Sequence, residues 1–309
     1  MSISVFDGHC DTILHCWREN EHLEHTTGHV DLERGKRFGR YCQFFALFTM
    51  DDMKPGLDDH GVYEEQYQLF CREMERNKDA VAHCRNGTEA RKAHEAGKIA
   101  AFLSVEGAHS LNCNLDTLRL AYDRGVRAVN LTWNNPNALS GTNCEEPERG
   151  LSEQGRAFVR EMQRLGMLVD VSHLSDPGFW DVIEIARRPI MASHSDSRAV
   201  WDHTRNLTDD MFTAIIKNHG VVGLNLCREF VGGAEDIDAL AGHLEHFLSL
   251  GGEKTVALGG DLDGCTPVKG IDDVAGWANF YERLLQFNYK ESLLEDLFFN
   301  NFMRVVDEL

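Results

Sequence analysis

Ser4-Val5-Phe6-Asp7-Gly8-His9-Cys10-Asp11 begins with the apolar residues of a β-strand and ends in polar ones. Because alternate residues of a strand face the same side, we expect His9 and Asp11 to point together at one small object while Cys10 faces away. A metal ion is the natural object for such a pair. The pattern is weak on its own, and the chain contains a second copy, His29-Val30-Asp31. Other residues of the chain must show which of the two His-x-Asp pairs could bind a metal.

Short apolar runs rich in Val, Ile, Phe and Leu recur along the chain, and a segment with helical periodicity follows each of them. Runs that are apolar almost throughout fit a parallel sheet that is buried on both faces. Eight such units without a Pro/Gly/Ser-rich linker predict one domain over residues 1–309, a (β/α)8 TIM-type barrel with a C-terminal helix. A doubly wound open sheet is the alternative, but no run leads into a Gly-x-Gly-x-x-Gly turn.

The expected strands are residues 5–9, 42–48, 100–106, 128–133, 168–173, 190–194, 221–226 and 255–261. The expected helices include residues 63–84, 115–124, 152–165, 175–186, 237–250, 274–287 and, at the end, 290–306.

Composition narrows the class of protein. The 42% hydrophobic fraction of the 309 residues supports a sizeable core, and no apolar run approaches the roughly 18 to 20 residues of a membrane span. The formal net charge of −19 would repel phosphate backbones and anionic lipids, so we expect neither a nucleic acid nor a membrane partner. The N-terminus shows no export signal, and the nine cysteines contain no Cys-x-x-Cys pair. These features predict a cytoplasmic protein with reduced cysteines.

Ionisable residues stand at the ends of five of the eight expected strands. The functional site of a β/α barrel lies at the carboxyl ends of its strands, so these side chains should meet on one rim. One such residue is more often structural, but the whole set is hard to explain that way. Three imidazoles and three carboxylates on one rim would be electrostatically costly unless cations were bound there. The set is His9, Asp11, Glu106, His173, His194 and Asp261.

The number of these side chains predicts two metal ions. Imidazole and carboxylate ligands suit zinc, and also manganese, iron or cobalt. Glu106 can bridge two ions with its two oxygens, which leaves His9 with Asp11 for one ion and His173 with His194 for the other. Two ions about 3.5 to 4 Å apart would hold a bridging water as hydroxide at neutral pH.

A metal-bridging hydroxide predicts hydrolysis. Asp261, on the last strand, would take the proton of the water and pass it to a leaving group, as a general acid/base. A further metal ligand without a proton role is the alternative for Asp261. A thiol nucleophile is a lesser alternative for the reaction, because only Cys10, Cys227 and Cys265 fall at plausible strand ends.

At this point the sequence resembles a known family, the membrane (renal) dipeptidase family of zinc metallopeptidases in the amidohydrolase superfamily. The matching motifs occur in the family's order and cover nearly the whole chain. The resemblance implies two zinc ions with the ligands divided as above, Asp261 as the catalytic acid/base, and hydrolysis of dipeptides that tolerates a D-residue on the C-terminal side. The motifs are Asp7-Gly8-His9-Cys10-Asp11, Ser104-Val105-Glu106-Gly107-Ala108-His109, Val169-Asp170-Val171-Ser172-His173, Ser193-His194-Ser195, His203-Thr204-Arg205-Asn206-Leu207 and Gly259-Gly260-Asp261-Leu262-Asp263-Gly264.

The resemblance also assigns three residues to the substrate pocket. Arg205 is implied to bind the free C-terminal carboxylate of the substrate by bidentate pairing; without the resemblance it is interpreted as a solvated charge. Trp133 stands where the family often has a histidine that contacts the scissile carbonyl, and Cys227 stands near the position of a tyrosine in mammalian members. These two departures concern the pocket, not the hydrolytic centre.

They keep a second function open: another amidohydrolase-superfamily enzyme, such as a deacylase or a lactam or lactone hydrolase. A non-catalytic barrel that binds peptides or metals is a third reading. The resemblance favours a homodimer. The mammalian proteins are secreted and lipid-anchored, whereas this sequence is similar to a cytoplasmic microbial relative.

Overall fold

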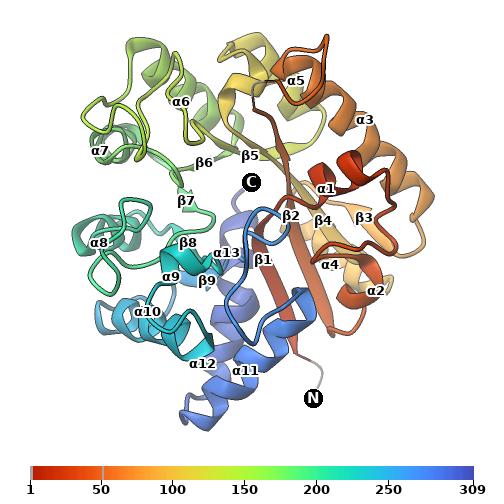
Figure 1. Cartoon of the computed structure of the whole chain (residues 1–309), viewed down its shortest axis with the longest axis vertical. Helices are drawn as coiled ribbons and strands as arrows, with labels where there is room; N and C mark the ends of the chain where they lie inside the picture. Colours follow the sequence, from red (N-terminus) through yellow and green to blue (C-terminus); the bar gives the residue numbers. More distant parts are fainter. Residues whose placement is uncertain (1–2, 51) are drawn as a thin grey trace.

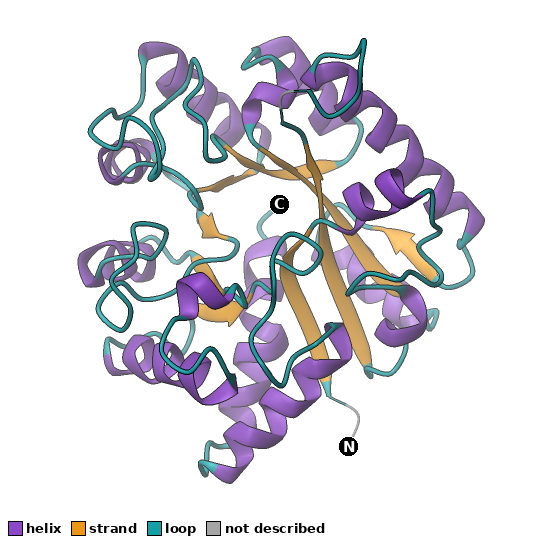
Figure 2. Ribbon diagram, in the orientation of Figure 1, coloured by secondary structure: helices purple, strands orange, loops and turns teal. Residues whose placement is uncertain are grey.

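The computed structural model describes residues 3–50 and 52–309. Eight parallel strands close into a barrel, because β1 pairs with both β2 and β9 and the other strands pair in chain order between them. Helices surround this ring (Figures 1 and 2). The predicted (β/α)8 barrel is confirmed. Its strands are β1 (Ser4–Cys10), β2 (Arg40–Phe48), β4 (Ile99–Glu106), β5 (Val126–Asn130), β6 (Leu168–Asp170), β7 (Met191–Ala192), β8 (Val221–Leu224) and β9 (Val256–Leu258).

Side-chain caps set where many of the surrounding helices begin. Ser152, Ser175 and Thr208 each accept a hydrogen bond from the backbone N–H three residues further on, as N-caps do. The α-helices are α1 (Thr12–Glu19), α2 (Leu32–Gly35), α3 (Asp59–Arg76), α4 (Gly87–Glu95), α5 (Leu115–Asp123), α6 (Glu153–Leu165), α7 (Asp176–Ile185), α8 (Asp209–Lys217), α9 (Arg228–Val231), α10 (Ile237–Ser249), α11 (Trp277–Gln286), α12 (Glu291–Glu295) and α13 (Asn301–Val306). In the described part of the chain, no helix combines the length and apolar character that a membrane crossing requires.

The predicted helix over residues 63–84 is too long. Helix α3 ends at Arg76, and a short extra strand, β3 (Val81–His83), follows it. Strand β3 pairs with the first three residues of β4, whereas β5 pairs only with the later residues of β4. Without β3 the start of β4 would have unpaired backbone groups on that side, so sheet pairing outweighs the helical pattern here.

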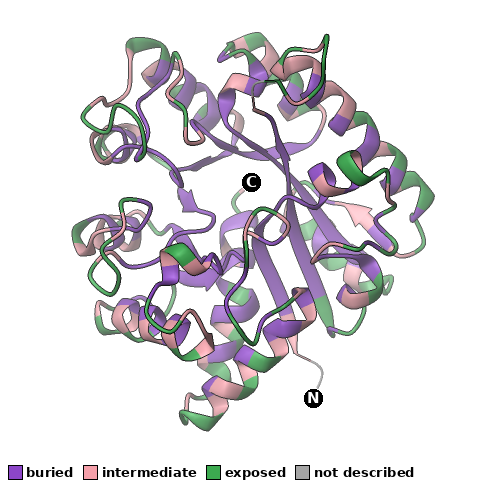
Figure 3. Ribbon diagram, viewed as in Figure 1, coloured by how far each residue is buried: buried purple, intermediate pink, exposed green. Residues whose placement is uncertain are grey.

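Two apolar layers hold the barrel together. One lies between the strands and the outer helices, and the other fills the barrel interior. In the interior, Phe6 stacks on Phe102 and Phe302, with ring centroids 5.4 and 5.0 Å apart. Phe302 belongs to the terminal helical segment, which runs from α12 through a π-helical turn, η3 (Asp296–Asn300), into α13. This segment matches the predicted terminal helix and packs into the barrel at the start of the strands. Figure 3 shows that the eight barrel strands are almost entirely buried, whereas β3 is only partly buried.

Candidate metal centre

A β-bulge places the first two candidate ligands. The register of β1 against β2 shifts between Asp7 and Cys10, where β1 has one residue more than β2. Phe6 and His9 both face the barrel interior as a result, although they are three residues apart and would face opposite sides of a regular strand. Cys10 packs in the layer beneath the helices, as predicted. The side chain of Asp11 again lies beside that of His9.

The other candidate ligands lie in the loops that leave the strands. Strands β6, β7 and β9 end two or three residues before His173, His194 and Asp261, so these predicted strands are too long. His173 and Asp261 have φ angles of 71° and 53°, in the left-handed region that non-glycine residues seldom adopt. Such strain persists where the surroundings enforce it and is common at functional sites.

Glu106, the last residue of β4, lies at the middle of the cluster. Its Oε2 is 3.5 Å from Nε2 of His9, and its Oε1 is 3.0 Å from Nε2 of His173 and 3.6 Å from Nε2 of His194. Asp11 Oδ2 is 3.5 Å from the same His9 nitrogen. Two potential metal-binding groups share Glu106, one with His9 and Asp11 and one with His173 and His194, and a third joins His9, His194 and Asp261. The first two groups contain the ligand pairs that the sequence predicts for two ions, and the assignment of ions to them stays a prediction.

Hydrogen bonds orient two of the imidazoles. Nδ1 of His173 lies 3.0 Å from the amide oxygen of Asn134, and Nδ1 of His194 lies 2.6 Å from Oγ of Ser193. With the proton on each Nδ1, both Nε2 lone pairs face the centre, where the two atoms lie only 3.1 Å apart. Both rings are thus set up to bind through Nε2.

Electrostatics favours the protonation states that metal ligands need at His173, His194 and Glu106, but not at His9. Burial acts to lower the pKa of His9, but the charges of Glu106 and Asp11 outweigh it and raise that pKa well above its ordinary value. Burial lowers the pKa of His173 to about 4 and that of His194 well below its ordinary value, so both rings are neutral. Burial acts to raise the pKa of Glu106, but the neighbouring His9 and His173 outweigh it and hold that pKa below its usual range. Neutral imidazoles and an ionised carboxylate are the forms that bind cations.

The buried polar atoms fit divalent cations. Both ring nitrogens of His9 and Oδ1 of Asp11 have no hydrogen-bond partner among the described residues, although both side chains are buried. Unsatisfied buried polar atoms are costly and need an explanation. Imidazole and carboxylate donors that converge on two points are the ligand set of zinc and related ions. The centre therefore suits metal ions.

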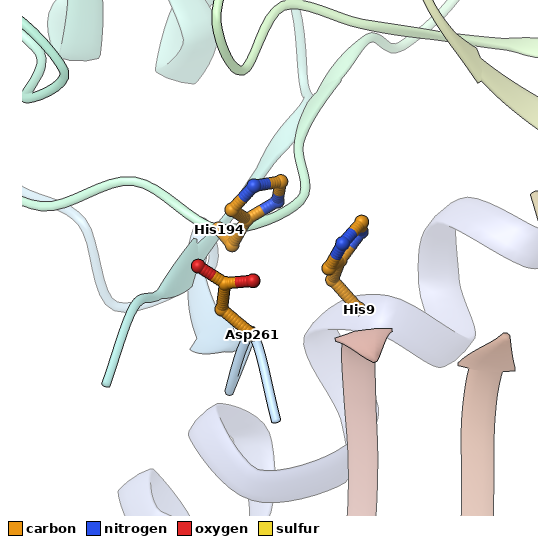
Figure 4. A group of neighbouring side chains, drawn as sticks. All are labelled: His9, His194 and Asp261. Atoms are coloured by element: carbon orange, nitrogen blue, oxygen red, sulfur yellow. The ribbon is translucent and has the colours of Figure 1, made fainter. Parts of the chain in front are cut away.

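Asp261 faces the same centre from the loop after β9. Figure 4 shows its carboxylate directed toward the rings of His9 and His194. Asn225 Nδ2 donates a hydrogen bond of 3.3 Å to its Oδ2. Burial raises the pKa of Asp261 well above its ordinary value; the charge of His9 opposes this shift, and that of Asp11 adds to it. A carboxyl group with a raised pKa is suited to carry a proton at neutral pH.

A cleft of about 560 Å³ opens over the centre at the carboxyl ends of the strands. Trp133 lines it, with its ring 4.9 Å from that of Phe48 and 6.4 Å from that of His173. The buried Cys227 lines it as well. The structure thus places both departures from the family pattern on the cleft wall.

Arg205 is buried beside this cleft and is not the solvated charge that its sequence context suggests. Its side chain lies over the ring of Phe230, a cleft residue, at 5.7 Å. Nη1 donates to Oγ of Ser195 at 2.7 Å, whereas Nε and Nη2 have no hydrogen-bond partner in the described part of the chain. A buried guanidinium with two unsatisfied donor atoms is chemically suited to pair with an anion.

The second His-x-Asp pair has a structural role instead. Asp31 caps helix α2 by accepting a hydrogen bond from the N–H of Arg34 at 2.7 Å. His29 accepts a hydrogen bond from the N–H of Asp263 at 2.9 Å. The two side chains therefore bind different partners.

Sequence reasoning missed the residues that orient the centre, namely Asn134, Ser193 and Asn225. Their positions did carry a signal, since each lies next to a strand end that also supplies a candidate ligand or a cleft residue. What the sequence lacked was the pairing across neighbouring strands, such as that between Asn225 and Asp261.

The fold and the cluster together define the chain as a metal-binding (β/α)8 barrel. The family model of the membrane dipeptidases, peptidase family M19, matches residues 1–309. The chain belongs to this family, and the resemblance seen in the sequence is confirmed.

Individual relatives agree with this assignment. An uncharacterised dipeptidase of Schizosaccharomyces pombe is 35% identical over 74% of this chain, and the match spans 55% of the yeast protein, about half its length. The dipeptidase aclJ of Aspergillus oryzae is 29% identical over 99% of this chain and 78% of its own. A metallopeptidase from Rhodobacter sphaeroides, solved with a phosphinate mimic of the dipeptide L-Ala-D-Ala, has a TM-score of 0.91 and 28% identity, covering 100% of this chain and 99% of that one.

Proposed function

We propose that this chain is a metal-dependent dipeptidase that binds two zinc ions and tolerates a D-residue on the C-terminal side of its substrate. The observation that carries the proposal is Glu106, which presents one oxygen to each of two buried ligand groups in a cleft. Membership of the M19 family supports it. The ligand of the Rhodobacter sphaeroides relative, a mimic of L-Ala-D-Ala, supports the substrate class.

His9 and Asp11 would hold one ion, His173 and His194 the other, and Glu106 both. Bound there, the ions supply Lewis acidity for the scissile carbonyl and lower the pKa of a nearby water. The residues around them keep the rings of His173 and His194 neutral and fix the direction of the two Nε2 atoms.

Asp261 performs the proton transfer in this proposal. It faces the centre, and its raised pKa fits a group that takes a proton from the attacking water and gives it to the departing amine. Asn225 positions the carboxylate through its hydrogen bond to Oδ2. Each turnover returns Asp261 to its starting protonation state.

Arg205 selects the substrate in this proposal. The free donors at Nε and Nη2 face no protein acceptor among the described residues and suit the bidentate pairing of a free carboxylate. A dipeptide carries such a carboxylate next to its peptide bond. Blocking the carboxylate as an amide should therefore abolish turnover.

Metal removal tests the proposal directly. The purified protein should contain two equivalents of zinc by elemental analysis and release free amino acids from L-Ala-L-Ala and L-Ala-D-Ala. Chelation should remove activity, and added zinc should restore it, because the ions activate the water. Full activity after verified removal of both ions would end the proposal.

A different amidohydrolase activity is the second candidate, because Trp133 and Cys227 line the cleft where the family has other residues. N-acetylalanine, a lactone and a β-lactam, assayed beside the dipeptides, distinguish the two. Turnover of any of these without dipeptide cleavage would favour the second candidate. The homodimer and the cytoplasmic location stay predictions.

A further inference from the structure

Two loops that border the cleft lie against each other and bring two cysteines together. The loop after β8 and the loop after β9 run antiparallel: the N–H of Val268 donates to the carbonyl of Leu226 at 2.9 Å, and Cys227 forms an isolated β-bridge with Pro267. Cys265 lies two residues before that proline. Both thiols line the cleft beside Asp261.

The two thiols are neighbours and are unequal: Cys227 bridges Pro267, and Cys265, two residues before that proline, is expected on the same side of the paired loops. Interactions with the Cys265 thiol and with the backbone N–H groups of Glu229 and Phe230 favour the thiolate form of Cys227. These interactions hold the pKa of Cys227 below its ordinary value, the one with Cys265 most of all. The same interaction, together with burial, raises the pKa of Cys265 well above its ordinary value. Cys227 is therefore the better nucleophile of the two.

We propose that Cys227 and Cys265 form an oxidation site at which a hydroperoxide produces a reversible disulfide in the wall of the substrate cleft. Nothing in the hydrolytic reaction requires two adjoining thiols in that position. The pairing of their loops, their shared cleft and the access that the cleft gives to small solutes carry the inference. All nine cysteines are free in the reduced protein.

The chemistry balances with hydrogen peroxide as the oxidant. The Cys227 sulfur attacks one peroxide oxygen and breaks the O–O bond, which gives a sulfenic acid and one water. The Cys265 sulfur then displaces the hydroxyl group as a second water, and the S–S bond forms. The two thiols lose two hydrogens, and the peroxide is reduced to water. A dithiol reagent reverses the step.

The disulfide should also switch off the hydrolytic site. Bonded sulfurs lie about 2.05 Å apart, closer than two thiols that are not bonded, so the two loops must approach each other. Cys265 moves with Asp261, because its N–H donates to the Asp261 carbonyl at 3.1 Å. A displacement of about 1 Å at a catalytic group can cost roughly 100-fold in rate. We therefore expect turnover to fall in proportion to the fraction of disulfide.

The disulfide itself is tested without reference to activity. The metal-loaded full chain is treated with hydrogen peroxide, the remaining thiols are alkylated under denaturing conditions, and peptides are mapped by mass spectrometry. We expect a peptide pair joined through Cys227 and Cys265, lighter than the two thiol forms by about 2 Da, that dithiothreitol separates. If both cysteines remain free to be alkylated while the exposed Cys144 is oxidised, the proposal is wrong.

The activity arm rests on the proposed dipeptidase function and uses substitutions. In Cys227→Ser and Cys265→Ser, each compared with its own untreated activity, the part of the peroxide inactivation that dithiothreitol reverses should disappear. Cys144→Ser is the matched control and should retain it. Reversible inactivation that persists in both cleft variants would overturn the proposal. A mapped disulfide without any dipeptide turnover would instead refute the proposed function alone.

Discussion

Asp261 combines a partly buried carboxyl group, a left-handed backbone and a place beside His9 and His194. Asp261→Asn keeps the shape of the side chain and removes its proton chemistry. We expect kcat to fall by roughly 100-fold to 10,000-fold, the range of a lost general acid/base, while metal content stays unchanged. Steady-state kinetics with elemental analysis measures both. Wild-type kcat would exclude the role, and loss of one metal equivalent would make Asp261 a ligand.

Arg205 tests how the cleft recognises its substrate. Arg205→Lys keeps the positive charge and loses the planar fork, so kcat/KM for a free dipeptide should fall by about 10-fold to 100-fold, the worth of a charged hydrogen bond. Arg283→Lys is the control, since Arg283 pairs with Asp238 on the surface. Equal kcat/KM in wild type and Arg205→Lys would show that the carboxylate is bound elsewhere.

At the scale of single residues, the sequence was sufficient to predict the candidate metal ligands. It was insufficient to predict the side chains that surround them. His9, Glu106, His173 and His194 were found because each follows an apolar run, and parallel strands end on one rim. The burial of Arg205 depends on how separate loops fold over the barrel, and no local pattern records it.

The bulge in β1 depends on the small size of Gly8. A Cβ at this position would meet the ring of Phe302 at 2.4 Å and the carbonyl oxygen of Ser193 at 2.9 Å. Gly8→Ala should therefore destabilise the protein by about 1 to 3 kcal/mol, the usual cost of overpacking. Urea unfolding measures this.

Gly242 provides the matched control for that substitution. It lies inside α10, and a Cβ there would meet nothing within 4 Å. Gly242→Ala should stabilise the protein by about 0.5 to 1 kcal/mol, because alanine loses less backbone freedom in a helix. If both alanine variants shift stability in the same direction, the close packing at Gly8 is not the cause.

Helices and strands were predicted well where polar caps or long apolar runs mark them. They were predicted poorly where pairing with a neighbouring strand determines the structure. The terminal helix and the start of α7 after Ser175 fall where the pattern places them. Strand β3 was taken for the end of α3, since only its pairing with β4 makes it a strand. The predicted ends of β6, β7 and β9 were too late. The residues that follow these strands continue directly into the site, and the sequence pattern does not mark where sheet pairing stops.

The molecule as a whole should lose stability in mild acid partly through His83 of β3. Burial lowers the pKa of His83 to about 4 from an ordinary value of 6.5, although the carbonyl of Gly125 opposes the shift. Between these values the unfolded chain binds a proton that the folded chain does not, so folding stability falls as the pH falls. The full effect is up to about 3 kcal/mol.

Replacing His83 with glutamine tests this. The free energy of unfolding of His83→Gln should fall less steeply than that of the wild type between about pH 6.5 and about pH 4, by up to about 3 kcal/mol. Urea titrations at several pH values give both curves. Parallel curves would show that His83 titrates alike in the folded and unfolded chain.

The closure of the β-barrel has a consequence for folding during synthesis. Strand β1 pairs with β9, and its Phe6 packs on Phe302, so the first strand of the barrel finds some of its neighbours in segments that are synthesised about 250 to 300 residues later. Until then a growing half-barrel presents open strand edges and uncovered aromatic rings, the features that attract other chains. Its yield in the cell should therefore depend on chaperones that shield nascent chains, and slowing translation should lengthen that exposure.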